Sequence, residues 1–399
     1  MNIVKTMRGL LRKSLSSPTD IERQLLGIRQ AAAGITVTPN NAMECVAVRA
    51  AVQVIAEAIG QLPVHVYKRK PDGSRERDSE NPAQALLHDA ATEWLSAHEF
   101  RELVTRDALL WGNGYAFILR EDDKPVELHR LDPCSVKVEI DDTTREPVYT
   151  YATGSVKAVY DFRDVLHIRA PSCDGYVGDS PVYLARDAIA LAMVMERHAS
   201  TLFKNFGKPS TVISVPGELG DDPAERMAKS WQAANSGENA GGTAVLEAGA
   251  TVTAITMTAV DAQLVEMRRF AIEEIGRIYR VPPIFIGDYG RATWSNNEAQ
   301  GTQLVEYCLM PWIKRWQGEL QLKLLTEDER KDFFFEFLVD DLLRADTAAR
   351  YEAYSKGITS RFLSPNEVRA RENLPPYDGG DTYENPNTTT TPTPMREAA

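Results

Sequence analysis

Apolar residues recur every three or four positions along several stretches of the chain, which is the spacing of one buried helix face. This pattern predicts long helices over 43–61, 97–111, 181–206, 262–281 and 298–325, and shorter ones over 223–234, 346–357 and 365–373. Pro63 and Pro282 directly follow two of these helices and end them, because proline cannot donate the helical hydrogen bond. Pro311 falls inside the last long helix, so we expect a kink near Met310.

Short apolar runs bounded by turn residues predict strands instead. They occupy 64–67, 115–120, 126–131, 135–140, 148–151 and 165–169, and later 211–215, 244–247, 252–257 and 333–339. Most strands therefore lie before residue 170, and most long helices lie after it. Strands and helices that are segregated in this way are typical of the α+β class.

The order of elements after residue 175 predicts a stalk with a small tip. Ser180 is placed as the N-cap of the helix over 181–206, with Pro181 at its first position. About 26 residues at 1.5 Å each give a rod of roughly 39 Å. A small α/β segment, 208–258, follows, and Asp261 is placed to cap the second long helix.

A loop without periodicity, 287–297, follows the second long helix. Trp294 lies in this loop close to Arg291, and a tryptophan in such a loop either contacts a partner or packs the loop onto its own helix. Both interpretations stay open. Trp312 and Trp316, four residues apart on one helix face, are predicted to lie in the core or in a subunit interface.

The composition indicates a chain with enough apolar residues for a sizeable core, since 43% of its 399 residues are hydrophobic. The formal net charge is −12, so the molecule as a whole repels DNA rather than gripping it. Four distant cysteines without a CxxC pair, and six scattered histidines, predict neither a disulfide framework nor a metal site. We interpret His129 and His167, both in predicted strands, as structural.

No stretch of the sequence is long and apolar enough to predict a transmembrane helix. Residues 1–15 place apolar and basic positions on opposite sides of a helix. They predict a terminal arm that docks on a neighbour or stays disordered, or else a surface-membrane helix or a transit peptide. Residues 377–399, rich in Thr, Pro and Asn, predict a flexible tail.

The motifs of common enzyme classes are missing. Gly207-Lys208 has no upstream glycine in P-loop register, and Gly178–Val182 lacks the final glycine of a nucleophile elbow. Asp340 and Asp341 follow a predicted strand, which is a position used for metals and leaves a metal-dependent nuclease as an alternative. We favour charged residues that close an edge strand. We therefore predict no enzyme activity, no metal and no cofactor.

Ten short segments, in this order, resemble the portal proteins (head–tail connectors) of long-tailed double-stranded DNA phages. They are Ile59–Val64, Leu109–Ala116, Leu131–Pro133, His167–Arg169, Gly178–Pro181, Ile278–Pro283, Ser295–Gln300, Ser364–Arg369, Leu374–Pro376 and Gly379–Asp381. Each fragment alone is a weak signal, but the full series in sequence order is specific. One departure is Ala299, where the family often carries a polar residue.

The resemblance implies a ring-forming fold with a wing, a long-helix stem, a small α/β clip, a kinked tunnel helix and a short helical crown. Carried over to this chain, the segments are an N-terminal arm 1–39, wing 40–180, first stem helix 181–207, clip 208–260, second stem helix 261–283, tunnel loop 284–297, tunnel helix with a wing strand 298–342, crown 343–376 and tail 377–399.

The same resemblance implies a function and its partners. The protein would form a dodecameric ring at one capsid vertex of the virion, after assembly in the cytoplasm of a bacterial host. Double-stranded DNA would pass through this ring during packaging and ejection. The ring would bind the large terminase, then head–tail adaptor proteins, and would contact the major capsid protein, but no membrane. The alternative is another ring-forming structural or channel subunit, for which we find no lipid-facing apolar band.

Two sets of residues are the candidate sites under this interpretation. The predicted tunnel loop offers Asp288, Tyr289, Arg291, Trp294, Asn296 and Asn297 to the channel, and the predicted clip offers Asp221, Asp222, Glu225 and Lys229 to protein partners. Trp294 either points into the channel or anchors the loop on a neighbouring tunnel helix. The kink at Pro311 is expected to bend that helix.

Overall fold

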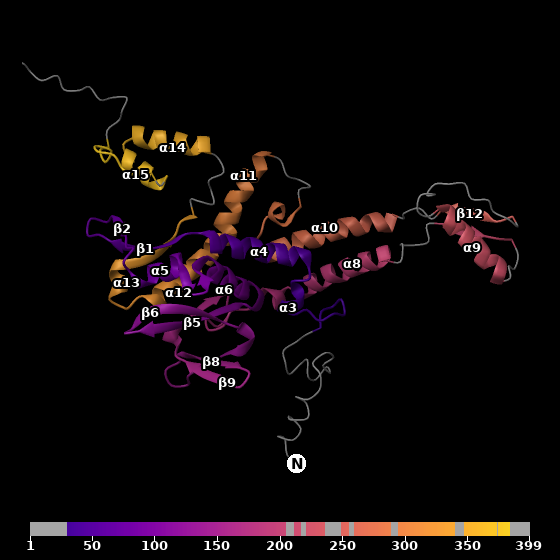
Figure 1. Ribbon diagram of the computed structural model, residues 1–399, viewed down its shortest axis with the longest axis horizontal. Coiled ribbons are helices and arrows are strands. Elements are labelled where there is room, and N and C mark those ends of the chain that lie inside the picture. The colour runs from indigo at the N-terminus through magenta and orange to yellow at the C-terminus, as the bar shows by residue number, and fades with distance from the viewer. Residues whose placement is uncertain are drawn as a thin grey trace, which may run out of the picture.

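The computed structural model describes residues 30–204, 211–216, 221–235, 249–254, 259–288, 294–339, 347–372 and 374–383. Figure 1 shows an α+β body from which two helices, α8 and α10, run side by side towards a small separate tip. The helical pair α14 and α15 lies above the body in this view.

The body holds most of the sheet structure and the main core. Its helices are α3 (Pro39–Ala42), α4 (Val46–Gln61), α5 (Pro82–His88), α6 (Ala97–Trp111), α12 (Met310–Leu324) and α13 (Glu329–Asp332), with 3-10 turns at Pro133–Ser135 and Phe162–Asp164. Its strands are β1 (Val64–Arg69), β2 (Arg75–Arg77), β3 (Ala90–Thr92), β4 (Leu95–Ser96), β5 (Asn113–Glu121), β6 (Lys124–Leu131), β7 (Val136–Ile140), β8 (Pro147–Thr153), β9 (Val156–Tyr160), β10 (Val165–Arg169) and β13 (Phe333–Phe337).

The remaining elements form the projecting part and the last helices. They are α7 (Pro181–Leu184), α8 (Arg186–Lys204), β11 (Thr211–Ser214), α9 (Asp221–Asn235), β12 (Thr251–Ala254), α10 (Ala259–Tyr279), the 3-10 turn η4 (Pro283–Ile286), α11 (Trp294–Gln303), the π-helical segment Leu304–Leu309, α14 (Thr347–Thr359) and α15 (Pro365–Arg371). The predicted strand over 244–247 lies outside the described residues.

The body holds three antiparallel sheets of three strands each, in the orders β13-β1-β2, β10-β5-β6 and β7-β8-β9, and the antiparallel pair β3-β4. The first sheet joins distant parts of the chain, because Val64 of β1 pairs with Phe337 of β13. Phe100 of α6 and Trp316 of α12 are fully buried in the core, where their rings meet edge to face. Trp316 also donates from Nε1 to Oγ1 of Thr105 at 3.0 Å, so it belongs to the core of the subunit.

One buried cation connects the ends of two helices. Arg101 of α6 donates to the carbonyl oxygens of Gly60 (2.6 Å), Leu62 (3.1 Å) and Leu87, which lie where α4 and α5 end. The last carbonyls of a helix have no partner within it, so the guanidinium satisfies groups that burial would otherwise leave unpaired. Burial lowers the pKa of Arg101 to about 10, and the side chain remains charged at neutral pH.

The helix predicted over 181–206 is interrupted, which corrects the expectation of one continuous rod. Ser180 is the N-cap as predicted, with its Oγ accepting from the N–H of Tyr183 at 3.3 Å. The helix then breaks at Ala185, whose φ and ψ are −104° and 17°. The single turn α7 packs on α6, while α8 runs along α10. The break at Ala185 lets the two parts of the helix take different directions and pack on different partners. Alanine carries no local signal for it.

Several helix starts also differ from the predictions, since α4 begins at Val46 instead of Met43 and α9 begins at Asp221 instead of Pro223. Helix α10 begins at Ala259, so Asp261 lies within its first turn rather than at the cap. Helix α11 begins at Trp294, four residues before the predicted Glu298. Serine and asparagine favour cap positions, but placing each of them inside a helix costs well under 1 kcal/mol. The backbone hydrogen bonds of the longer helix outweigh this cost.

The tunnel helix of the prediction consists of α11, a π-helical segment and α12. Pro311 is the second residue of α12, directly after Leu304–Leu309, where the helix is widened to a π turn. Proline removes one backbone donor, and π-helical segments occur mostly as short irregularities of this kind inside α-helices. A bend angle at Pro311 stays a prediction.

Two glycines bring the end of α6 and the loop before α7 into backbone contact. Gly112 ends α6 with φ of 82° and accepts from the N–H of Ala170 at 2.8 Å. A Cβ on Gly112 would lie 2.5 Å from the carbonyl oxygen of Gly178, and a Cβ on Gly178 would overlap the carbonyl of Gly112. Ser180 completes the contact, since its Oγ donates to the carbonyl of Leu110 at 2.7 Å. Side chains are therefore excluded at this junction.

Gly112→Ala is expected to destabilise the protein more than the matched change Gly73→Ala. Both glycines have φ of 82°, but a Cβ on Gly73 would contact nothing within 4 Å. Each alanine incurs the left-handed backbone cost of about 1–2 kcal/mol, and Gly112→Ala adds an overpacking cost of about 1–3 kcal/mol. Denaturant unfolding measures the difference, and equal midpoints for the two variants would contradict the close backbone contact.

Candidate functional site

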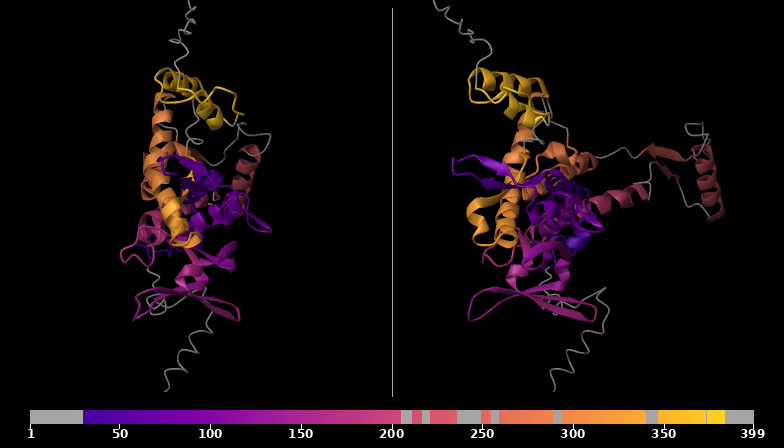
Figure 2. Two further views of the ribbon diagram at one scale, coloured as in Figure 1. Left: turned by 90° about the vertical axis from the view of Figure 1, so that its left-hand side faces the viewer. Right: turned by 60° about the vertical axis from the view of Figure 1, so that its left-hand side comes forward.

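The paired helices α8 and α10 expose apolar side chains that one subunit does not cover. Leu191 of α8 is 41% exposed, and Met267 and Phe270 of α10 are 51% and 52% exposed. Ala271 and Ile275, on the side of α10 towards α8, are buried. Figure 2 shows that the pair projects from the body with little structure around it. Apolar surface in a continuous patch of this kind marks a contact with another molecule.

Two separate hollows lie along this helix pair. One of about 270 Å³ is lined by Leu191, Met267 and Phe270, and the other, of about 500 Å³, by Val46 and Ile272 among others. Met267 and Ile272 belong to different stripes of α10, because they are five residues apart on a helix with 3.6 residues per turn. The helix pair thus borders two different surfaces, one apolar and one in which apolar side chains lie beside Glu196 and Arg268.

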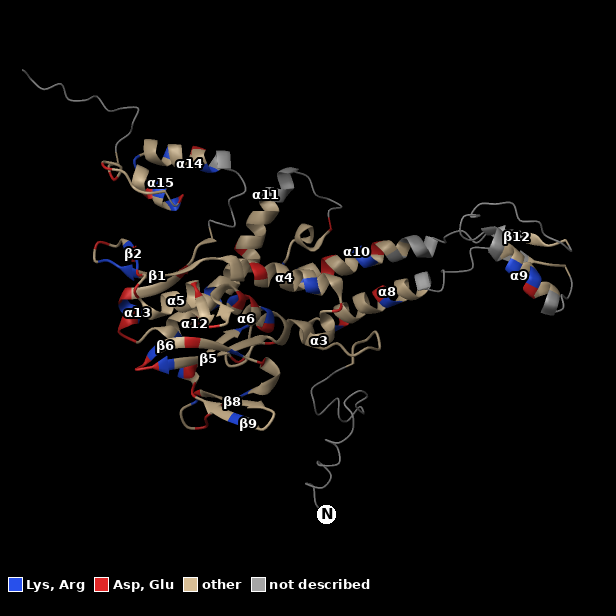
Figure 3. Ribbon diagram, viewed as in Figure 1, with Lys and Arg blue, Asp and Glu red and all other residues tan. Residues whose placement is uncertain are grey.

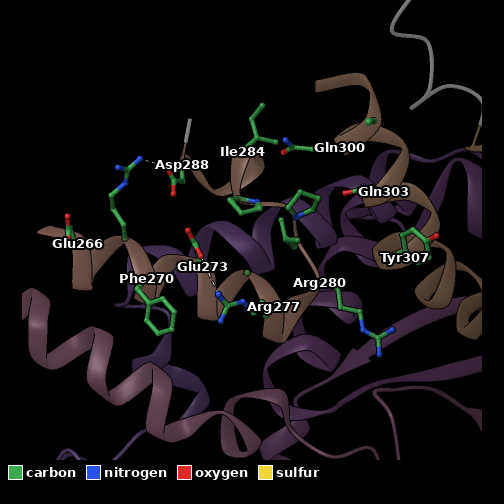
Figure 4. Close-up of a pocket in the computed structure, with 16 residues that line it drawn as sticks. Glu266, Phe270, Glu273, Arg277, Arg280, Ile284, Asp288, Gln300, Gln303 and Tyr307 are labelled. Carbon is green, nitrogen blue, oxygen red and sulfur yellow. Dashed lines mark hydrogen bonds and ion pairs between the residues drawn. The ribbon is translucent and has the colours of Figure 1, made fainter. Parts of the chain in front are cut away.

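A larger groove lies at the end of α10, as Figure 4 shows. It has a volume of about 910 Å³ between α10, the 3-10 turn η4 and the helix that starts with α11. Charged side chains of α10 line one wall, where Arg277 pairs with Glu273 at 3.3 Å. Gln300, Gln303 and Tyr307 line the opposite wall.

The structure describes the two ends of the predicted tunnel loop. Asp288 is only 14% exposed, and its Oδ1 pairs with Nη2 of Arg269 on α10 at 3.1 Å. Gly287 before it has φ of 90° and turns the chain. Tyr289 and Arg291 lie outside the described residues.

The other end of that loop is helical. Trp294, Asn296 and Asn297 lie in the first turns of α11, and where their side chains point is outside the described part of the structure. The predicted loop is therefore shorter than 287–297, since α11 takes its last four residues. Asp288 is the candidate whose contacts are defined, and it holds the start of the loop to α10.

The predicted clip contains an antiparallel strand pair and a helix. Thr211 of β11 pairs with Ala254 of β12, and α9 begins with Asp221 and Asp222. Both acids lie at the helix N-terminus, where the macrodipole favours negative charge. Glu225 and Lys229 form an exposed ion pair of 2.7 Å one turn apart. Exposed pairs contribute below about 1 kcal/mol, so both side chains can exchange this contact for a partner.

A buried polar cluster of Asn113, His167 and Tyr149 lies next to the contact between Gly112 and Gly178. The sequence patterns did not predict that these residues meet. Oδ1 of Asn113 accepts from the N–H of Gly178 at 2.7 Å and lies 2.9 Å from Nε2 of His167, and its Nδ2 donates to Gly178 O at 2.9 Å. The hydroxyl of Tyr149 lies 3.1 Å from Nδ1 of His167. One neutral tautomer satisfies both ring nitrogens: Nε2–H donates to Asn113 and Nδ1 accepts from Tyr149.

Glu319 connects this cluster to α12. Its Oε1 accepts from the N–H of His167 at 3.3 Å, and its carboxylate is 3.5 Å from Arg169 and 3.8 Å from Lys323. Burial raises the pKa of Glu319, although the two cations oppose that shift. Burial, with Arg169 second, lowers the pKa of His167 well below its usual value. His167 is thus structural, as predicted.

The signal for this cluster was present in the sequence as separate fragments. Three segments of the resemblance supply Asn113, His167 and Gly178, and the fold brings them together: Leu109–Ala116, His167–Arg169 and Gly178–Pro181. Sequence spacing could not show this, because Asn113 and Gly178 are 65 residues apart.

Metal-ligating side chains were searched for among the described residues. These residues contain no group of three or more His, Cys, Asp or Glu side chains that could hold a metal ion. Asp340 and Asp341 lie outside the described part of the chain. All four cysteines are free thiols, of which Cys45 and Cys308 are buried. Among the described helices, none is both long enough and apolar enough to cross a membrane.

The amino-acid sequence of this chain matches a protein family and several known proteins. The family described as phage portal protein matches residues 46–373. A probable portal protein of Streptomyces phage phiC31 is 32% identical, over 88% of this chain and 79% of the relative. The portal protein of Enterobacteria phage HK97 is 30% identical, over 83% and 78%.

Solved structures share the fold. A chain in the virion of a native gene transfer agent particle superposes with a TM-score of 0.62 at 22% identity, covering 94% of this chain and 99% of that one. A phage portal protein of the HK97 family from Corynebacterium diphtheriae gives 0.52 at 16% identity, covering 78% and 98%.

Stability is expected to fall as the pH drops below about 6.5, the pKa of an unfolded histidine. The native state keeps His167 neutral, and burial and Arg77 lower the pKa of His65 to about 4. Below pH 6.5 these histidines bind protons in the unfolded chain but stay neutral in the native chain. Their contribution to the free energy of unfolding is therefore fully present above pH 6.5 and decreases below it. Each histidine contributes up to about 1.4 kcal/mol per pH unit.

His167→Gln is expected to lower the stability at pH 7.5, because hydrogen bonds are lost, and to flatten the slope between pH 6.5 and 5. Urea unfolding across this range measures both effects. His98→Gln is the control, since His98 is exposed. If His167→Gln keeps the wild-type slope, the neutral buried histidine is excluded.

Proposed function

The chain belongs to the phage portal protein family, and from this premise we propose that it forms a closed ring of twelve subunits that conducts double-stranded DNA. A gene transfer agent neck with the same fold is described as having C12 symmetry. Twelve copies would close a ring through identical head-to-tail contacts.

The exposed apolar surfaces of α8 and α10 carry the proposal. A head-to-tail contact needs two different surfaces on each subunit, and the helix pair offers two hollows on different stripes of α10. The surface with Met267 and Phe270 would meet the surface with Val46 and Ile272 on the next copy. This contact would bury side chains that are half exposed in the single chain.

The charge of the chain suits a conduit. With −12 per subunit, a ring of twelve would carry about −144, so its channel would not hold phosphates through many salt links at once. The tunnel loop would line the narrowest part, with Asp288 fixing its start and Tyr289, Arg291, Trp294, Asn296 and Asn297 following. One arginine per subunit steadies a duplex without arresting it.

The tip would be the docking site for protein partners. It lies at the far end of the stem in Figures 1 and 2, away from the body. The acids of α9 and the exposed Glu225–Lys229 pair would orient the large terminase and later the head–tail adaptors. The body would contact the major capsid protein at the portal vertex of the virion, after assembly in the host cytoplasm. The ring itself would hydrolyse nothing.

Native mass spectrometry tests the ring. Twelve copies of 44.4 kDa give about 533 kDa for the wild type. Met267→Glu combined with Phe270→Glu is expected to yield folded monomers, because a charge buried in an apolar contact costs several kcal/mol per site. Val159→Glu, at another exposed apolar position, is the control and should form rings. Rings formed by the double variant would refute the interface, and the absence of rings in the wild type would refute the ring.

Charge reversal tests the tip. Asp221→Lys, Asp222→Lys and Glu225→Lys together are expected to leave ring assembly intact and to reduce DNA packaging or tail attachment at least tenfold, because charges at a rim tune encounter and orientation. The control reverses three exposed acids of the body, Glu80, Glu93 and Asp142. Packaging yield and infectivity are the measurements. Equal yields for both triple variants would remove the role of the tip.

A further inference from the structure

A cavity of about 430 Å³ lies where the end of α10 meets the start of α12. Its lining comes from the end of α6, the chain around α7, the last residues of α10, the π-helical segment and the first turns of α12. Arg280, directly after α10, and Arg315 of α12 both line it, and we call this space the arginine cavity. Figure 4 shows Arg280 extending away from Gln300 of the neighbouring groove.

Arg280 has no counter-ion among the described residues. Its side chain forms no ion pair and no hydrogen bond with any residue that the structure describes. Arg277 on the same helix shows the usual arrangement, since it pairs with Glu273 at 3.3 Å. Figure 3 shows acidic and basic residues close together along α10. The N–H donors of Arg280 are therefore available to a ligand.

Arg315 is positioned by its own helix. Its Nη1 donates to the carbonyl of Pro311 at 3.2 Å, and its guanidinium lies 5.3 Å from the centre of the Trp312 ring. A cation over an aromatic ring keeps its remaining N–H donors for another partner. Asp179 also lines the cavity, but within the described part of the chain it forms no ion pair with either arginine.

The charge of Arg280 acts on two other groups of the cavity wall. Burial, and then the charge of Arg280, lower the pKa of Arg315. Burial raises the pKa of Cys308 to about 12, and Arg280 opposes that shift. The guanidinium of Arg280 thus lies near both side chains. Two like charges in a partly buried space repel each other, and an anion between them would remove this cost.

The backbone of Arg280 adopts a conformation that favours glycine. Its φ is 58°, because it ends α10 in a Schellman motif. The N–H of Val281 donates to the carbonyl of Gly276 at 2.9 Å, and the N–H of Arg280 to that of Arg277 at 3.3 Å. Glycine would bear no steric cost at this position, whereas arginine does. Strained residues of this kind are typical of functional sites, and folding stability does not explain the arginine.

We propose that the arginine cavity binds one oxyanion, a phosphate or a carboxylate group, between Arg280 and Arg315. Guanidinium groups match the oxygens of such an anion, and hydrogen bonds between charged partners are among the stronger ones. Leu184 and Ile278 border other parts of the cavity, and apolar walls strengthen the attraction by excluding water. The bound anion would link the end of α10 to α12 beside the π-helical segment. The site does not depend on the proposed ring, because both arginines belong to one chain.

Equilibrium dialysis of the full chain with radiolabelled inorganic phosphate, at constant ionic strength, tests the site. The wild type is expected to bind phosphate saturably, with about one ion per chain. Arg280→Gln combined with Arg315→Gln should weaken binding at least about tenfold, because charge-assisted hydrogen bonds are lost. The matched control, Arg277→Gln with Lys314→Gln, removes one exposed cation from each of the same two helices, and neither residue lines the cavity. It should bind phosphate as the wild type does.

Arg280→Gly separates loss of the site from loss of the fold. It removes the guanidinium and the left-handed strain together, so this variant should resist denaturant at least as well as the wild type. It should nevertheless bind phosphate at least about tenfold more weakly. Wild-type affinity in this variant would overturn the role of Arg280.

Dialysis of assembled rings and of monomers identifies the source of the anion. Phosphate bound by rings is a ligand from solution, whereas phosphate bound by monomers alone means that a carboxylate of the next copy fills the cavity in the ring. Either result supports the oxyanion site. The site is refuted if neither form binds phosphate, or if the arginine variant and its control bind phosphate equally. If no rings form, the monomers still test the cavity, so its failure is distinct from failure of the ring.

Discussion

Close backbone contact between Gly112 and Gly178 is the constraint on which the rest of the structure depends. It ends α6 in a left-handed turn, places β5 beside β10, and sets the point from which the stem leaves the body. Because no side chain fits between the two backbones, covalent geometry and hydrogen bonds fix the point at which the chain enters α7, while α10 is positioned by its packing on α4. Ser180 and Asn113 then complete that contact from either side.

Buried polar groups reinforce the same junction. Asn113, His167 and Tyr149 satisfy one another, and Glu319 connects them to the helix that leads back to the predicted tunnel loop. Such a network adds little net stability compared with an apolar core, but it permits few alternative arrangements. A subunit that must join identical neighbours in a closed ring needs a fixed angle between body and stem, since small angular errors accumulate around the ring.

The exposed surfaces of the helix pair and of the tip differ in polarity, so they suit different kinds of contact. The helices α8 and α10 present exposed apolar side chains that suit contacts between copies, and the tip presents the exposed ion pair of Glu225 and Lys229. Apolar contacts persist in salt, whereas exposed ionic contacts weaken with it. A lasting ring and exchangeable partners are therefore compatible in one subunit.

Local signals in the sequence determined several elements in detail. Helix α6 spans the predicted 97–111, Ser180 is the cap, and the order of short segments indicated the family. These features depend on neighbouring residues, such as a cap beside a proline or a glycine with positive φ, and are readable from one stretch of chain. The α+β class followed from the same patterns.

Tertiary structure alone decided the features that join distant residues. The pairing of β1 with β13, the break at Ala185 and the start of α11 at Trp294 have no sufficient local cause, because packing against other elements selects them. The cluster around Asn113 and the alignment of Arg69 with Arg75 likewise exist only once strands are in register. A sequence specifies what each segment prefers, and the free energy of burying those segments together decides which preferences survive.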